Sequence, residues 1–226
     1  DPHLGAVQHP VVAVEDRAGR RFLVDATPAF PEQAIRLRKL ARDRKSSGRS
    51  LPFEGILLTH AHMGHYTGLI HLGREAAHTQ EMALWATKPM RKFLSANRPF
   101  SYLAERGEIA FKTLQSGKPV ALSPSLKVTP ISVPHRNEDA DTVCFLFAES
   151  GKTFLYLPDA DSFPERITRL IRDVDLALID GTFYTHDEVS SGRVDARRIP
   201  HPPIAGTSAA LAEARALDAA DKTGTL

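Results

Sequence analysis

Three histidines lie within the seven-residue segment Thr59-His60-Ala61-His62-Met63-Gly64-His65, which is the part of the sequence best suited to chemistry. Histidine is the commonest metal ligand, and two histidines separated by one residue at a strand end can turn both rings toward one ion. We therefore predict metal ligands at His60, His62 and His65. The alternative is that these are ordinary surface or core histidines.

The elements on either side of these histidines are expected to be a buried strand and a helix. Gly55-Ile56-Leu57-Leu58 is short, apolar and rich in branched residues, as a fully buried strand should be. Tyr66-Thr67-Gly68-Leu69-Ile70 has the spacing of a first helical turn. The histidines would then occupy a loop held by two regular elements, and such loops commonly carry functional residues.

Further polar residues follow other predicted strands, so loops can present them at a shared edge with the histidines. Taken alone, Asp159 or Asp161 can also be read as capping a helix or forming a turn before Phe163-Pro164-Glu165. Together with the histidines they make a plausible set of metal ligands. The residues are His135 after Ile131-Ser132-Val133-Pro134, Asp159 and Asp161 after Tyr156-Leu157-Pro158, and Asp180 after the run from Val174 to Ile179.

Length and composition describe a chain able to fold as one domain. With 226 residues, of which 42% are hydrophobic, we predict a single domain over residues 1–226. The formal charge of +2 is too small to indicate nucleic acid by itself, and no run of about eighteen apolar residues offers a membrane span. Cys144 is the only cysteine and lies in an apolar run, which predicts a buried, inert thiol and favours the reducing cytoplasm. The first residues do not have the pattern of a signal peptide, although an upstream piece can be missing.

Hairpins, strands and helices follow one another in an order that predicts two packed sheets covered by helices. Two hairpins and three further strands are expected, and the last of these strands is expected to be buried. The hairpins pair residues 10–14 with 21–25 and 142–148 with 153–157, the strands are residues 82–86, 126–133 and 174–179, and the helices are residues 31–45, 88–97 and 208–220.

A basic segment surrounds the end of the first predicted helix. Such a run is usually a solvated face, and the functional alternative is that focused positive charge steers an anionic substrate toward the site. Its cationic residues are Arg36, Arg38, Lys39, Arg42, Arg44, Lys45 and Arg49.

The order of the candidate ligands resembles the metallo-β-lactamase superfamily, whose signature is H-x-H-x-D-H after a strand, then a lone histidine, a bridging aspartate and a last histidine. His60, His62 and His65 match the signature. His135 is similar to the lone histidine, and Asp159 is similar to the bridging carboxylate. The resemblance implies an α/β fold of the αββα sandwich type, two packed mixed sheets flanked by helices, with the metal ligands on loops along one edge.

Shorter stretches resemble particular groups within the superfamily. Residues 22–28, 65–69 and 180–183 look like the pyrroloquinoline quinone biosynthesis protein B group. Residues 199–204 resemble the histidine loop of related phosphodiesterases and tRNA 3′-processing endonucleases, where that histidine assists catalysis. The resemblance therefore implies a catalytic role for His201, and proton transfer would suit its near-neutral pKa. The alternative is that His201 faces solvent.

Two departures from the signature bear on the number of metal ions. Gly64 stands where the signature has an aspartate, and the chain stops before a last histidine. Either the native chain is longer or the protein lacks that ligand. These departures leave His65 and a share of Asp159 for a second metal, and two protein ligands seldom hold a divalent ion.

The first metal position keeps three histidines, His60, His62 and His135, and leaves a fourth position open for water. We therefore predict one well-occupied metal site. Zinc is the expected ion, and iron or manganese stay open because histidine with carboxylate also suits them.

The predicted function is metal-dependent hydrolysis of an ester, amide or phosphodiester by a metal-activated water. Asp159 would orient or deprotonate that water, and His201 would protonate the leaving group. The substrate is expected to be a small or peptide-derived molecule, with an anionic one favoured by the basic segment; no membrane or nucleic-acid partner is expected. Two alternatives are an iron-dependent oxidation in pyrroloquinoline quinone biosynthesis and a non-catalytic binding or carrier protein with a degenerate metal site.

Overall fold

The computed structural model describes residues 11–40, 51–185, 187, 199, 201–209 and 211–212. Contacts between residues divide the chain into two compact units. The first consists of Asp1–Pro130 with Asn137–Asp141, and the second of Ile131–Arg136 with Thr142–Leu226. The single-domain assignment stays a prediction.

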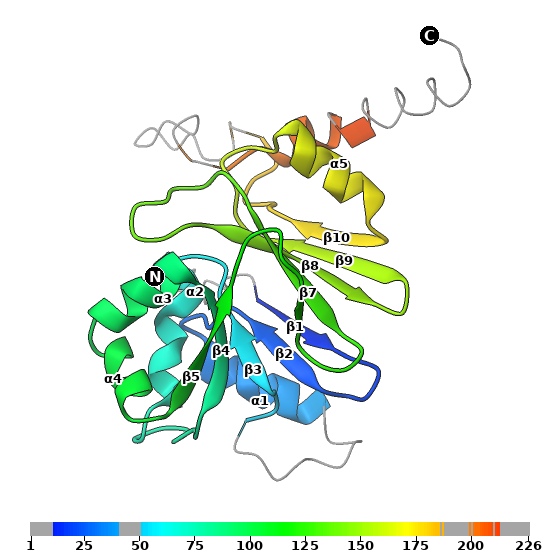
Figure 1. The fold of residues 1–226 in the computed structure, drawn as a ribbon. Helices are drawn as coiled ribbons and strands as arrows, with labels where there is room; N and C mark the ends of the chain where they lie inside the picture. Colours follow the sequence, from blue (N-terminus) through cyan, green and yellow to red (C-terminus); the bar gives the residue numbers. More distant parts are fainter. Residues whose placement is uncertain are drawn as a thin grey trace, which may run out of the picture. The chain divides into compact units, whose positions relative to one another are not determined.

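A mixed five-stranded sheet forms the centre of the first unit (Figure 1). The predicted hairpin at its start is confirmed, with its first two strands antiparallel, whereas the other neighbouring pairs are parallel. Leu23, Ile56 and Leu84 lie in register on three adjacent strands and are almost completely buried. The strand order follows the chain: β1 (Val12–Glu15), β2 (Arg21–Val24), β3 (Gly55–Leu57), β4 (Met82–Thr87) and β5 (Ile109–Leu114).

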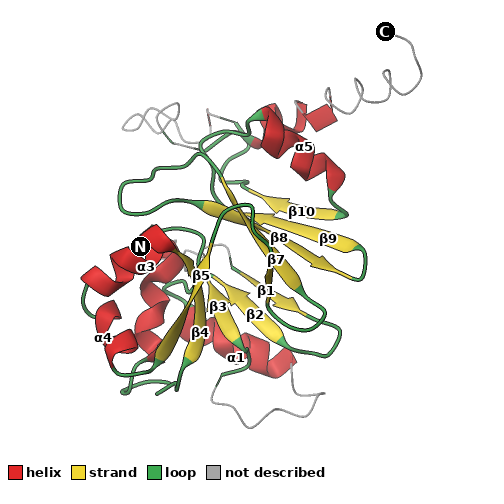
Figure 2. Cartoon of the chain, in the orientation of Figure 1, coloured by secondary structure: helices red, strands yellow, loops and turns green. Residues whose placement is uncertain are grey.

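Helices of the first unit pack against this sheet and against one another (Figure 2). The N-cap of α3 (Lys88–Ala96) is Thr87, whose hydroxyl accepts a hydrogen bond from the Met90 amide. Met90 and Leu94 form its buried side. The helices are α1 (Phe30–Leu40), α2 (Met63–Tyr66), the 3-10 helix η1 (Thr67–Leu72), α3 (Lys88–Ala96) and α4 (Phe100–Glu105).

The second unit is built around the predicted hairpin of β8 (Val143–Glu149) and β9 (Lys152–Leu157), which is confirmed as antiparallel. β10 (Leu176–Ile179) runs parallel to β9, and α5 (Glu165–Asp173) lies between them in the chain. The second sheet has the strand order β10-β9-β8-β7-β6, with β7 (Lys127–Ser132) and β6 (Val120–Ala121), and the division into units falls within β7. Two mixed sheets with helices confirm the predicted fold class.

The last strand differs from its prediction in burial. Residues 174–179 are predicted to form a buried strand, yet Leu176 and Leu178 of β10 are 56% and 47% exposed. β10 is at the end of its sheet, and only Ala177 and Ile179 pack against the apolar cluster of this unit. The apolar run therefore forms an edge strand with one covered face rather than an interior strand.

Some predicted segments lie partly outside the described residues. α1 is confirmed as far as Leu40, and residues 41–45 of the predicted helix are not among those described. Residues 204–209 are helical, and most of the predicted helix over 208–220 also lies outside the described part. Within the described part, no helix has the length and apolarity needed to cross a membrane.

Cys144 is expected to resist thiol reagents in the folded protein. Its side chain is fully buried, and this burial raises the pKa of the thiol to about 12, outweighing the opposite effects of a backbone hydrogen bond and of Arg166. At pH 8 we expect labelling by a chromogenic disulfide to be at least about a hundredfold slower than in denaturant. Equal labelling rates in both conditions would contradict the buried position.

Gly68 is expected to be intolerant of a side chain because it lies against the turn that follows β2. A Cβ there would lie 2.2 Å from the Thr27 carbonyl oxygen and 2.7 Å from the Phe30 Cβ. We expect Gly68→Ala to lower the free energy of unfolding by about 2–4 kcal/mol, measured by urea denaturation. Gly206→Ala is the control, because the nearest atom to its Cβ would be 3.6 Å away, at ordinary contact distance; equal losses in both variants would contradict the account.

Candidate metal centre

In the first unit, the candidate residues lie just beyond the ends of two parallel strands. β2 ends at Val24 and β3 at Leu57, and these two residues are paired in register. The Asp25 amide donates to the Leu57 carbonyl at 2.8 Å, which continues this pairing past the strand end. Asp25 and the loop beginning at Thr59 therefore emerge at the same edge of the sheet.

The three histidines of the signature lie together in this loop and in the short helix after it. The ring centroids of His60 and His62 are 4.6 Å apart, and those of His60 and His65 are 4.2 Å apart. His60 and His65 are buried, whereas His62 is partly exposed at the N-cap of α2. Their role as metal ligands stays a prediction.

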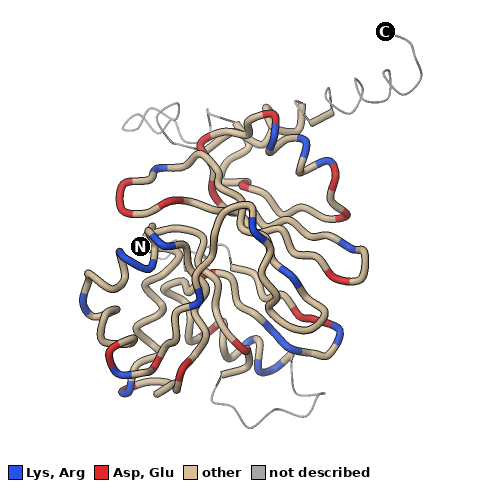
Figure 3. Tube along the Cα trace, viewed as in Figure 1, with Lys and Arg blue, Asp and Glu red and all other residues tan. Residues whose placement is uncertain are grey.

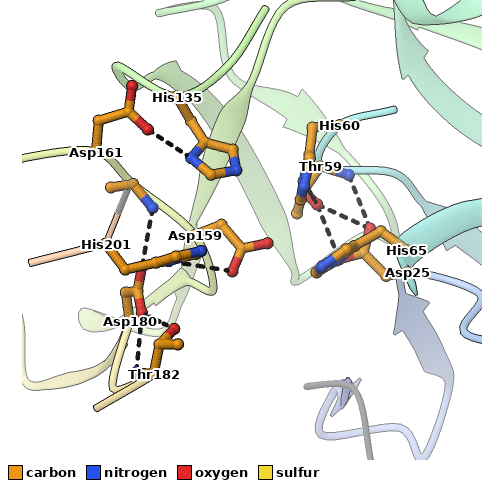
Figure 4. Close-up of polar contacts among 11 residues, drawn as sticks. Asp25, Thr59, His60, His65, His135, Asp159, Asp161, Asp180, Thr182 and His201 are labelled. Carbon is orange, nitrogen blue, oxygen red and sulfur yellow. Dashed lines mark hydrogen bonds and ion pairs between the residues drawn. The ribbon is translucent and has the colours of Figure 1, made fainter. Parts of the chain in front are cut away.

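Asp25 holds two of these histidines in place (Figure 4). Its carboxylate is inaccessible to solvent and accepts hydrogen bonds from the Thr59 amide at 2.9 Å and the Thr59 hydroxyl at 2.8 Å. It also accepts from Nδ1 of His65 at 2.8 Å. Because the Thr59 hydroxyl donates to Asp25, it can only accept from Nδ1 of His60, at 2.9 Å. The network therefore assigns the Nδ1 protons of both histidines and directs Nε2 of each ring to any metal.

The second unit repeats this arrangement with another buried aspartate. β9 and β10 are parallel, and their last residues, Leu157 and Ile179, are paired, so Asp159 and Asp180 follow the strands at one edge. The Asp180 carboxylate, also inaccessible to solvent, accepts from the Ala160 amide at 3.1 Å and the Thr182 hydroxyl at 2.7 Å. These bonds tie together the loops that follow both strands.

His201 and His135 are each held by a carboxylate in this unit. Nδ1 of His201 lies 2.5 Å from Oδ2 of Asp180, and Nδ1 of His135 lies 2.9 Å from Oδ1 of Asp161. The two rings are 5.4 Å apart. Burial lowers the pKa of His201, but the hydrogen bond and charge of Asp180, with the charges of Asp159 and Asp161, outweigh it, so the pKa is raised.

Asp159, Asp180 and His201 lie close enough together to be ligands of one metal ion. One candidate ligand atom from each residue lies within 4.8 Å of the others. The alternative that Asp159 or Asp161 caps the following helix does not hold, since the N-cap of α5 is Pro164 and no side chain caps it. The carboxylate of Asp161 instead contacts His135.

Four of the histidines share one feature that favours a metal function. His60, His65, His135 and His201 each have Nδ1 bonded to a carboxylate or to a hydroxyl that itself bonds a carboxylate. Metal-binding histidines characteristically donate their second ring nitrogen in this way, which fixes the ring and raises its basicity.

The basic segment is only partly described. Arg36, Arg38 and Lys39 are exposed on α1, and the other cationic residues of the segment lie outside the described part of the chain. Steering of an anionic substrate by this segment stays a prediction.

Comparison with known proteins places the chain in a family. The family model of the beta-lactamase superfamily domain matches residues 20–223. The chain therefore belongs to the metallo-β-lactamase superfamily, whose fold is shared by hydrolases of several kinds.

Within the superfamily the chain is similar to coenzyme PQQ synthesis protein B. It is 30% identical over 207 residues to that protein from Methylobacterium sp. (strain 4-46), covering 84% of this chain and 67% of the relative. It is 28% identical to that of Ruegeria pomeroyi, with 94% of this chain and 74% of the relative covered.

Solved structures confirm the fold. Zinc-bound PqqB from Methylobacterium extorquens matches with a TM-score of 0.72 at 24% identity, over 86% of this chain and 68% of that one. A diphosphatase of the PhnP family matches with a TM-score of 0.61 at 19% identity, over 92% and 71% of the two chains. At these identities the likeness concerns the fold alone.

Proposed function

We propose that the chain is a metal-dependent hydrolase that uses a metal-activated water on an ester, amide or phosphodiester. The observation that carries this proposal is the set of four histidines fixed through Nδ1, in two units that each present acidic and histidine side chains after parallel strands. Such fixed rings are suited to holding a divalent ion through Nε2.

The proposed ligands follow the order of the family signature. His60, His62 and His135 would hold a well-occupied metal, and His65 with Asp159 would form the weaker second position. Zinc is the proposed ion, which agrees with the zinc bound to PqqB of Methylobacterium extorquens. Histidine nitrogens and carboxylate oxygens are donors that zinc prefers, and Nδ1 is already bonded in His60, His65 and His135.

The bound metal would lower the pKa of its water and polarise the bond to be cleaved. The residues of this chain would supply the proton transfers. Asp159 is buried beside His201, with its Oδ1 4.0 Å from Nδ1, and would accept the proton of the attacking water. His201 has a raised pKa and is held by Asp180, so it is suited to give a proton to the leaving group.

The proposed substrate is a small or peptide-derived molecule, and the proposed compartment is the cytoplasm. The lone buried cysteine is in keeping with a reducing environment. Three substrate classes test the reaction: a p-nitrophenyl ester, a p-nitroanilide and bis(p-nitrophenyl) phosphate. We expect turnover of at least one, abolished by a chelator and restored by zinc. Turnover that persists in the chelated protein would contradict the proposal, as would no turnover of any class by the zinc-loaded protein.

The similarity to coenzyme PQQ synthesis protein B favours a second candidate function. It is an iron-dependent oxidation, with molecular oxygen as the oxidant, of a peptide-derived precursor. Stoichiometric iron in the purified protein, with oxygen consumption in the presence of such a precursor, would support this candidate over hydrolysis. Zinc alone, with no oxygen consumption, would contradict it.

A further inference from the structure

The first unit contains a groove along α3 that the metal chemistry does not use. The groove has a volume of about 860 Å³, and its wall is mainly apolar, with Phe93 among the lining side chains. Three cationic side chains line it together with one carboxylate: Lys88, Arg91, Lys92 and Asp139. It is large enough for a molecule of substrate size.

The cationic residues form one stripe of the helix. Lys88, Arg91 and Lys92 are spaced three and four residues apart, which places them on the same face, and all three are exposed. The opposite face of α3 carries the buried Met90 and Leu94. Figure 3 marks in blue the lysine and arginine positions along the backbone of the chain. The stripe therefore presents positive charge to solvent over an apolar wall.

The groove is connected to the histidine cluster of the same unit through two contacts. Phe93 packs edge-on against Tyr66, the residue after His65, with ring centroids 5.3 Å apart. Asp139 lines the groove together with Phe93. Glu138, the residue before Asp139, approaches His62: its Oε2 lies 3.7 Å from Nε2 of His62.

The loop that carries these acidic residues is anchored to the first unit. The Thr87 hydroxyl donates to the Asp141 carboxylate, and Ala140 is buried in the apolar cluster of the unit. Thr87 also caps α3, so the groove wall and the loop share one residue. The acidic loop and α3 are therefore held to each other through Thr87.

We propose that this groove binds the anionic part of the substrate, with an apolar segment of the same molecule lying along Phe93. The proposal rests on the proposed function, since it assigns the groove as an extension of the metal site. A phosphate or a carboxylate would satisfy the same cations, because Arg91 offers a fork of donors and the two lysines offer point charges.

Binding of non-hydrolysable probes by the zinc-loaded chain tests the proposal. Benzylphosphonate and phenylsuccinate both carry a phenyl ring, the first with a phosphonate group and the second with carboxylates. Benzyl alcohol is the neutral control. Isothermal titration at low salt should show binding of at least one anionic probe and weaker binding of benzyl alcohol. A preference for benzylphosphonate or for phenylsuccinate would identify the anion. If neither anionic probe binds, the proposal is overturned.

Paired variants locate the binding. Arg91→Ala with Lys92→Ala should weaken binding of the anion by at least about tenfold, the size expected for two charged contacts. Lys112→Ala with Lys118→Ala makes the same change in net charge on exposed residues that do not line the groove, and should change binding less than about twofold. Equal weakening in both pairs would overturn the proposal, because net charge would then be the cause.

The His62→Ala variant separates this proposal from the proposed function. Anion binding that survives in it and is weakened by Arg91→Ala with Lys92→Ala lies in the groove, whether or not the chain proves to be a hydrolase. Anion binding lost in His62→Ala and kept in the Arg91→Ala, Lys92→Ala pair would place the probe on the metal and overturn the groove proposal.

Discussion

Replacing Asp25 with asparagine is expected to weaken zinc binding by about 10- to 100-fold. Asp25 accepts from Thr59 and from Nδ1 of His65, and through Thr59 it also fixes His60. An amide offers one acceptor oxygen where the carboxylate has two, so the His65 ring or the Thr59 hydroxyl loses its partner. Asparagine tolerates the left-handed backbone of this residue, with φ of 66°, so the chain direction is kept.

A matched variant, Asp16→Asn, separates the effect of Asp25→Asn on stability from its effect on zinc affinity. Asp25→Asn should lower the free energy of unfolding by about 1–3 kcal/mol, because buried donors lose their acceptor. Asp16 is also buried and accepts from the Ala18 and Arg20 amides, in a turn between β1 and β2. Asp16→Asn should destabilise the protein comparably and leave the zinc affinity, measured by competition with a chromophoric chelator, within about twofold. An unchanged zinc affinity in Asp25→Asn would contradict the account.

Replacing His201 with alanine is expected to reduce kcat by about 10²- to 10⁴-fold for substrates with a poor leaving group. The proposed role of His201 is to protonate that group, with Asp180 holding the ring through Nδ1. A good leaving group such as p-nitrophenolate needs little protonation, so its kcat should fall much less. The measurement is kcat for a series of esters or diesters that differ in the pKa of the leaving group.

The dependence on leaving group distinguishes proton donation from a merely structural effect. Loss of His201 by a structural route would lower kcat equally across the series. The control His78→Ala removes an exposed histidine of the first unit and should leave all the rates within about twofold. Equal losses for good and poor leaving groups in His201→Ala would contradict the role of proton donor.

The hairpins and the strand before the histidines could be predicted because local patterns determine them. Residues 10–14 and 142–148 are mostly apolar runs, and each is followed by a turn that contains charged residues and one glycine. Strand period and turn chemistry need no long-range information. α4 and α5 were not predicted. The N-cap residues of α4 and α5 are Pro99 and Pro164, and neither forms a side-chain cap, so both helices lack the usual start signal.

The residues that orient the histidines are less evident from the sequence than the histidines themselves. The type and spacing of His60, His62 and His65 identify them directly. Asp25 lies 34 residues from its partner Thr59, and Asp180 lies 21 residues from His201, so only the pairing of parallel strands brings them together. The available signal was an aspartate directly after an apolar strand, which applies to both.

The burial of β10 could not be predicted because it depends on the position of the strand in its sheet. The run from Leu176 to Ile179 is as apolar as the interior strand β3. The apolar pattern indicates that the segment is a strand. Whether one or both of its faces are buried depends on its place in the sheet.

The metal content of the purified chain, determined by elemental analysis after expression without added metal, tests the central claim most directly. The account predicts close to one zinc per chain in the native sequence and in His78→Ala, and almost none in His62→Ala. Equal metal content in the native protein and His62→Ala would contradict the assignment of the histidine cluster as the metal centre, and so would a native protein that binds no metal even when zinc is supplied.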